Sequence, residues 1–267
     1  MTSAISLAFD RSPLARDRFM SRLLRPLPVT RRAELREDVL VAARQNWEAR
    51  TRSEYRGVMI VRHFHGLLVD LNAPTDVQEL ALLMMLQEQQ HAALCMQAAV
   101  ELGADGTLSF HLDELQLARH GRPDEELLRM LCGTYATGEV VALALIRHAI
   151  RVLPPSPFRD ILRGIARDEV LHARIGPALL QQAREDDEGW LPYPGDDVIR
   201  RMVRESMEHM LTRDVVEAEE EALFQDVEAA AQLRSVGIPP STAFKKAYER
   251  AVREDVARGL ARVGIVL

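Results

Sequence analysis

The sequence predicts an all-helical protein built around a four-helix bundle, in which two antiparallel hairpins are joined by one long crossover. Three observations lead to this prediction. Apolar residues recur with helical spacing along nearly the whole chain, and no strand-like alternation bounded by hairpin turns stands out. Two connections between long helical stretches are short, whereas the connection between these two pairs is long enough to cross the length of a bundle.

The ends of the four bundle helices are marked by residues that stop or start helices. Asn72-Ala73-Pro74 separates the first two helices, Gly103 ends the second, and Pro154-Pro155-Ser156-Pro157 separates the last two. The expected bundle helices cover about residues 31–71, 75–102, 124–153 and 158–184. We expect a mixed connection over 104–123, with a short helix near 112–119.

The segments outside these helices extend the bundle at both ends. Residues 1–30 are expected to be largely irregular, and two further helices are expected near 196–233 and 240–263. We expect residues 1–267 to form a single domain, a length that can bury a core without disulfide staples. Its predicted parts are a bundle core over 31–184 and a C-terminal helical extension over 185–267 packed on that core.

Composition and charge narrow the class of protein. Cys95 and Cys132 fall in apolar helical stretches and no CxxC pair occurs, which excludes a zinc ribbon or rubredoxin-type iron site and indicates a reduced, cytoplasmic protein. The formal net charge of −6 argues against nucleic acid as the main partner, although residues 11–32 are locally rich in arginine. No run of 18 uninterrupted apolar residues occurs, so no membrane partner is expected.

Two short motifs carry the functional signal. The second expected helix contains Glu88-Gln89-Gln90-His91, and the fourth contains Glu169-Val170-Leu171-His172. Residues at positions i and i+3 project from the same face of a helix, so each Glu and His can bind one metal ion together. Two such matches in a chain rich in glutamate prove little without a supporting context.

The other two bundle helices supply that context. Glu54 and Glu139 each lie within an apolar stripe of the first and third helices, at distances from the hairpin turns similar to those of the two motifs. At about 1.5 Å per residue, all these side chains reach a similar height in the bundle. Four carboxylates and two imidazoles are therefore expected to converge.

A buried group of four carboxylates requires compensating charge. Unpaired buried carboxylates are costly and repel one another, and too few basic residues lie on the same faces to pair with them. Two divalent cations would balance four negative charges. Oxygen-rich ligands with two imidazoles suit iron or manganese better than zinc, whose structural sites favour cysteine.

A glutamate and a Glu-x-x-His motif, each occurring twice, resemble the ligand set of the ferritin-like di-iron carboxylate proteins. The resemblance covers about residues 35–185 and implies two iron ions, with a manganese–iron pair also compatible. The residues expected to bind the metals and to carry the reaction are Glu54, Glu88, His91, Glu139, Glu169 and His172. The resemblance assigns the first three to one ion and the last three to the other, with Glu88 and Glu169 as bridging carboxylates.

Two neighbouring residues have alternative interpretations. Asp168 resembles an aspartate of the oxygenase and ribonucleotide reductase branches that would accept a hydrogen bond from His91, but an exposed aspartate explains the position equally well. Tyr135 lies one turn before Glu139 and is either a core tyrosine or a redox-active or hydrogen-bonding neighbour of the metals.

The resemblance implies an oxidoreductase, a di-iron oxygenase (monooxygenase) or oxidase that activates dioxygen to oxidise a small organic substrate. It also implies an electron donor, a reductase or ferredoxin. Leu143 and Ile165 depart from the threonine of bacterial multicomponent monooxygenases and the histidine of arylamine N-oxygenases, so neither branch is indicated. Two other functions stay open: a ferroxidase or peroxide-reducing iron-handling protein without an organic substrate, and a non-catalytic helical interaction module. A homodimer is expected from the prevalence of such assemblies.

Overall fold

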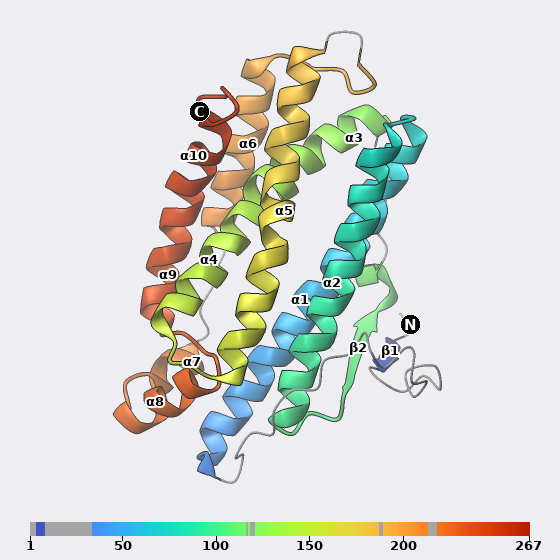
Figure 1. Cartoon of the computed structure of the whole chain (residues 1–267). Helices are drawn as coiled ribbons and strands as arrows, with labels where there is room; N and C mark the ends of the chain where they lie inside the picture. Colours follow the sequence, from blue (N-terminus) through green and yellow to red (C-terminus); the bar gives the residue numbers. More distant parts are fainter. Residues whose placement is uncertain (1–3, 9–33, 116, 118–120, 187–188, 213–217) are drawn as a thin grey trace.

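Long helices form the centre of the molecule in the computed structural model, which describes residues 4–8, 34–115, 117, 121–186, 189–212 and 218–267 (Figure 1). Helices α1 (Glu37–Asp70) and α2 (Thr75–Glu101) form the first hairpin. The second hairpin pairs a composite third helix with α5 (Pro157–Glu185). The four predicted bundle helices are therefore present, with α1 beginning a few residues later than the sequence suggested.

The two hairpin turns use the residues that the sequence marked. In the first turn, Asn72 adopts a positive φ of 50°, which asparagine tolerates better than most residues. In the second, Ser156 caps α5 by accepting a hydrogen bond from the Arg159 backbone N–H at 3.2 Å, and Pro157 occupies the first turn of the helix. Both turns are short, so each pair of helices is antiparallel.

The third bundle helix is continuous but not uniform. It consists of α3 (Pro123–Met130), the π-helical segment η5 (Leu131–Gly138) and α4 (Glu139–Val152). Inside η5, the Thr137 hydroxyl donates to the Cys132 carbonyl at 2.7 Å. Segment η5 ends at the residue before Glu139, and π-helical turns are frequent at functional sites.

The crossover between the hairpins contains a strand that the sequence analysis missed. Strands β1 (Ala4–Ala8) and β2 (Thr107–His111) form an antiparallel pair, and η4 (Leu112–Leu115) follows. The prediction of an irregular N-terminus is therefore wrong for residues 4–8, while residues 9–30 lie outside the described part of the chain. Phe110 is buried and packs on α1 through Tyr55, with the ring centroids 5.4 Å apart.

The C-terminal region is helical, but its predicted first helix is divided. The segments are α6 (Asp196–Leu211), α7 (Ala218–Leu223), α8 (Val227–Ser235), α9 (Ser241–Arg250), the π-helical η6 (Ala251–Asp255) and α10 (Val256–Ala261). The single helix predicted over 196–233 is wrong because Asp226 starts a new helix, accepting hydrogen bonds from the Glu228 and Ala229 backbone N–H groups at 2.9 Å. Helices α6 and α9 and segment η6 pack against η5 and α4 (Figure 1).

The buried apolar side chains fall into two clusters along the bundle axis. One contains Phe64, Met84 and Leu131, and the other contains Trp47, Cys95 and Ile165. Side chains of the C-terminal helices belong to the same clusters as those of the bundle. Along α1, α2 and α5, the two clusters are separated by the level of the ExxH motifs, so the polar site lies in the middle of the core.

One helical stretch among the described residues, Pro123–Val152, has the length and hydropathy of a possible membrane span. In this fold the stretch is the third helix of the bundle, where it packs against α5 and the C-terminal helices. The expectations of no membrane partner and a cytoplasmic location stay predictions.

Candidate metal centre

Four helices each present acidic or imidazole side chains to the layer between the two apolar clusters. Glu54 comes from α1, and Glu139 is the first residue of α4, immediately after η5. The Glu88–His91 pair comes from α2, and the Glu169–His172 pair from α5. Glu88, His91, Glu169 and His172 are at most 4% exposed, a degree of burial that glutamate and histidine rarely show without partners.

The structure brings all six predicted residues together in two overlapping groups. In the first group, His91 Nδ1 lies 3.3 Å from Glu54 Oε2 and 3.3 Å from Glu169 Oε1. The ligand atoms of these three residues lie within 4.8 Å of one another. The group therefore has the dimensions of a metal site with one imidazole and two carboxylates.

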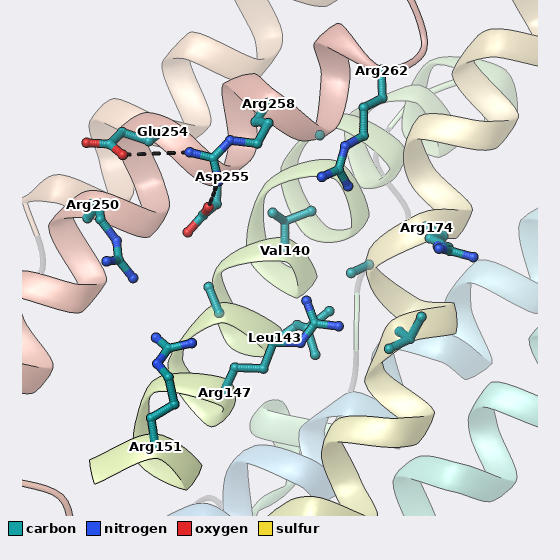
Figure 2. Close-up of a pocket in the computed structure, with 14 residues that line it drawn as sticks. Val140, Leu143, Arg147, Arg151, Arg174, Arg250, Glu254, Asp255, Arg258 and Arg262 are labelled. Carbon is teal, nitrogen blue, oxygen red and sulfur yellow. Dashed lines mark hydrogen bonds and ion pairs between the residues drawn. The ribbon is translucent and has the colours of Figure 1, made fainter.

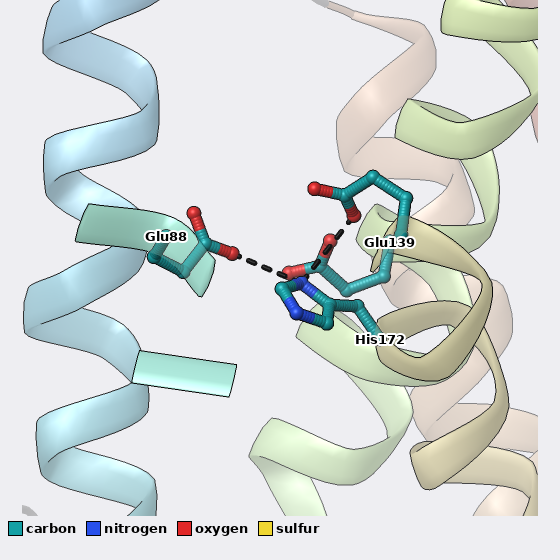
Figure 3. A group of neighbouring side chains, drawn as sticks. Glu88, Glu139 and His172 are labelled. Carbon is teal, nitrogen blue, oxygen red and sulfur yellow. Dashed lines mark ion pairs between the residues drawn. The ribbon is translucent and has the colours of Figure 1, made fainter. Parts of the chain in front are cut away.

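The second group contains Glu88, Glu139, Glu169 and His172, again with ligand atoms within 4.8 Å of one another (Figure 3). His172 Nδ1 lies 3.0 Å from Glu88 Oε1 and 3.4 Å from Glu169 Oε2. Figure 3 shows Glu88 reaching across from α2 toward His172. Glu169 thus belongs to both groups, as a carboxylate that bridges two ions would.

The position of Glu88 adds detail to the predicted grouping. The resemblance assigned Glu88 to the ion of Glu54 and His91 as a bridging carboxylate, and in the structure its carboxylate lies in the group of His172. The Glu88 carboxylate lies over Gly57 of α1, where the absence of a Cβ leaves room for it. Gly57 is a feature of the site that sequence reasoning did not find.

Both histidines point one ring nitrogen at the group and the other away from it. His91 Nε2 lies 3.2 Å from Asp168 Oδ2, and His172 Nε2 lies 3.1 Å from Gln87 Oε1. Each Nε2–H can donate to an outer oxygen, which fixes the ring orientation and leaves Nδ1 facing the carboxylates. The Asp168 contact is the one that the resemblance implied.

Gln87 was missed, although the sequence contains a signal for it. Gln87 directly precedes Glu88, as Asp168 directly precedes Glu169, and each contacts the histidine of the opposite motif. The two halves of the site therefore differ in this outer position, with a carboxylate beside His91 and a neutral amide beside His172. An anionic acceptor makes the stronger hydrogen bond and increases the basicity of its imidazole.

Several buried atoms of the site lack hydrogen bonds within the described residues. They are His91 Nδ1, His172 Nδ1, Glu169 Oε2 and the Tyr135 hydroxyl. The two Nδ1 atoms have carboxylate oxygens at 3.0–3.4 Å, but without hydrogen-bond alignment. These atoms face one another across the site but are not paired by hydrogen bonds. This arrangement is the one expected of atoms that bind metal ions.

In the metal-free protein, several carboxylates and both imidazoles of the site have shifted pKa values. Burial, together with the negative charge of Glu169 and Glu88, raises the pKa of Glu139 well above its usual range, and burial raises the pKa of Glu88 to about 7. Burial opposes charging of the histidines, but the nearby carboxylates outweigh it and raise the pKa of His91 to about 11 and of His172 to about 10. Protons on these groups replace part of the positive charge that metal ions would supply.

The other candidates near the site have different surroundings. The Tyr135 ring is buried against Phe64 with centroids 4.6 Å apart, and burial and the nearby Glu139 raise its pKa. Its packing fits a core tyrosine, while its hydroxyl without a described partner fits a neighbour of the site. His63 belongs to neither group and forms a partly buried pair with Glu126 at 2.8 Å.

Comparisons with known proteins bear on the fold. No family model matches the sequence, and no curated protein matches it. Among solved structures, protein 19 from Synechococcus, described as having aldehyde deformylating oxidase activity, matches with a TM-score of 0.50 and 17% sequence identity. The match covers 85% of this chain and 98% of the Synechococcus chain. The chain has the fold of a ferritin-like helical bundle.

Proposed function

We propose that this protein is a non-haem di-iron oxidase or oxygenase that uses dioxygen to oxidise a small organic molecule. The observation that carries the proposal is the buried layer of four glutamates and two histidines, in which Glu169 is shared by two groups. The description of a protein with the same fold as an oxidase supports the same general chemistry. A manganese–iron pair would fit the same ligands.

The proposed roles of the residues follow from the two groups. Glu54, His91 and Glu169 would hold one ion, and Glu88, Glu139, Glu169 and His172 would hold the other. Two bound iron ions would supply the redox chemistry with dioxygen. Asp168 and Gln87 would orient the two imidazoles through their Nε2–H groups.

The apolar clusters on either side of the layer also have a role in this proposal. They keep bulk water away from the site, which strengthens the electrostatic interactions of the carboxylates with bound cations. Position and orientation are set by helices rather than by loops, so the ligands are held rigidly. An external electron donor and a homodimeric assembly remain part of the proposal.

The test compares metal-dependent oxygen consumption in three forms of the protein. Metal-free wild-type protein is loaded anaerobically with Fe(II) and exposed to dioxygen with a reductant, and the uptake is followed with an oxygen electrode. Glu139→Ala is expected to abolish the metal-dependent uptake while the helical circular dichroism signal is kept. Glu79→Ala, which removes an exposed glutamate from α2, serves as the matched control and is expected to behave as wild type.

Three outcomes would contradict the proposal in different ways. Retained uptake in Glu139→Ala would show that the predicted ligand set is wrong. Continued oxidation of many Fe(II) ions per chain, with release of ferric iron and no use of the reductant, would indicate an iron-handling protein instead. Absence of metal binding would favour a non-catalytic helical module.

A further inference from the structure

A separate cleft of about 550 Å³ lies between α4 and α5 on one side and α9, η6 and α10 on the other (Figure 2). None of the six candidate metal ligands lines it. Val140, Leu143 and Val170 contribute apolar surface to the cleft. Its volume lies within the range of about 300–1,000 Å³ that is typical of small-molecule sites.

The walls of this cleft are strongly basic. Six arginines line it, and they come from α4, α5, α9, α10 and the residue that follows α10: Arg147, Arg151, Arg174, Arg250, Arg258 and Arg262. The acidic residues that line it are Glu254 and Asp255, so six arginines against two acids give a formal charge of +4. The whole chain carries −6, so this concentration of positive charge is opposite in sign to the protein.

Both acidic residues of the cleft form ion pairs with the same arginine. Arg258 lies 2.7 Å from Asp255 and 3.8 Å from Glu254. For the other five arginines, the described part of the chain provides no ion pair with an acidic side chain. Like charges that converge on one cleft repel one another, and an anion bound there would remove the repulsion. In Figure 2, Arg147 and Arg151 lie on α4, Arg174 lies on α5, and Arg250 and Arg262 lie on the opposite wall.

We propose that this cleft binds a small molecule carrying at least two phosphate groups. The guanidinium group is a planar fork of donors that matches phosphate and carboxylate oxygens with paired hydrogen bonds. A ligand with several negative charges can pair with arginines from several helices at the same time. The apolar surface beside them suits an organic portion of such a ligand, and the concave shape favours a small molecule over the flat surface of a protein.

The position of the cleft links it to the bundle without making it depend on the metal centre. Leu143 and Ala173 line it, and each lies four residues after a candidate ligand, Glu139 and Glu169 respectively. A bound polyanion would therefore contact the two helices that carry those ligands. The inference rests on the cleft alone, so it holds or fails independently of the proposed di-iron function.

The experiment measures binding of inorganic triphosphate to metal-free, full-length protein by titration calorimetry, with inorganic phosphate as the comparison. Triphosphate is expected to bind at least tenfold more tightly than phosphate, with an affinity that falls as salt is raised. Arg147→Gln/Arg174→Gln, which removes one arginine from each of two helices, is expected to weaken triphosphate binding by tenfold or more. Arg201→Gln/Arg204→Gln removes the same charge from exposed positions of α6 and is expected to change binding less than twofold.

Several results would overturn the proposal. They are no triphosphate binding, triphosphate binding no tighter than phosphate binding, or equal weakening in the two double variants. Vesicles containing phosphatidylglycerol test the other source of phosphate groups. If the vesicles bind the protein in an Arg147- and Arg174-dependent way and triphosphate does not compete, the cleft recognises a lipid surface and not a small polyanion. Circular dichroism and thermal unfolding of each variant separate loss of the cleft from loss of the fold.

Discussion

Gly57→Ala tests the path of the Glu88 side chain. A Cβ added at Gly57 would lie 2.5 Å from Glu88 Cδ and would overlap Glu88 Oε2. Ordinary carbon–carbon contact begins near about 3.5 Å, so the carboxylate has to move by about 1 Å. Metal–ligand distances tolerate only about 0.2 Å, so this movement removes Glu88 from its position as a ligand.

Gly57→Ala is expected to weaken metal binding but to favour the helical conformation of α1. We expect Gly57→Ala to weaken metal binding by about 10- to 100-fold, or about 1.4–2.7 kcal/mol. Alanine favours a helix over glycine by about 1 kcal/mol, which offsets the displacement of Glu88 in the metal-free protein. The free energy of unfolding without metal should therefore stay within about 1 kcal/mol of wild type.

The assay combines calorimetric titration of Mn(II), which avoids oxidation, with urea unfolding of the metal-free protein. Gly164→Ala on α5 is the control, because its Cβ would meet only the Arg167 side chain at 3.9 Å. The control should gain the same helix stability and bind metal as wild type does. Unchanged metal binding in Gly57→Ala would refute the assignment of Glu88 as a ligand.

The remaining predictions concern packing, ring orientation and protons. Gly176→Ala should destabilise the protein by about 1–3 kcal/mol in urea unfolding, because the added Cβ would lie 2.7 Å from the Ala136 backbone nitrogen. A variant as stable as wild type would show that α5 and η5 are not closely packed. Asp168→Asn should weaken Mn(II) binding by about tenfold or more because it removes the anionic acceptor of the His91 ring, and unchanged affinity would show that this contact is not used. Metal binding should release protons, because His91 and His172, with pKa values raised to about 11 and 10, must become neutral to bind a metal ion. The Mn(II) affinity should therefore fall at least tenfold per pH unit as pH decreases from 8 to 6. An affinity that does not change with pH would contradict the pKa shifts.

The same pKa shifts have a consequence for the metal-free protein at alkaline pH. Both histidines have folded-state pKa values raised above the unfolded value of about 6.5, so the attraction between the charged imidazoles and the nearby carboxylates stabilises the fold fully below that value. The stabilisation is lost as pH rises through about 10 to 11. A decrease in pH therefore weakens metal binding, whereas the stabilisation that the two charged histidines give to the metal-free fold is lost in alkali.

The sequence was sufficient for the helices that carry the site and for the convergence of its side chains. Helical spacing is a local property, and the turn at Asn72 and the stop at Gly103, which has a φ of 99°, are encoded by the residues themselves. The similar heights of the ExxH motifs followed from helix rise alone. These features depend on few long-range contacts.

The features that were missed depend on contacts between distant segments. Strand β2 alternates, with Leu108 and Phe110 buried, but its partner Ala4–Ala8 lies about a hundred positions earlier, so no hairpin turn marks the pair. The π-helical segment leaves no mark in the apolar pattern of Leu131–Gly138, because it adds a local hydrogen-bond shift without a change in composition. The side-chain path of Glu88 likewise depends on Gly57 in a neighbouring helix.

The central claim is that this bundle binds two metal ions between its apolar clusters. The most direct test is an anaerobic Fe(II) titration of metal-free protein, with the ions bound per chain counted after removal of free metal. The structure predicts two tightly bound ions, since Glu169 is shared by two groups of ligands. Zero or one bound ion per chain would contradict the account.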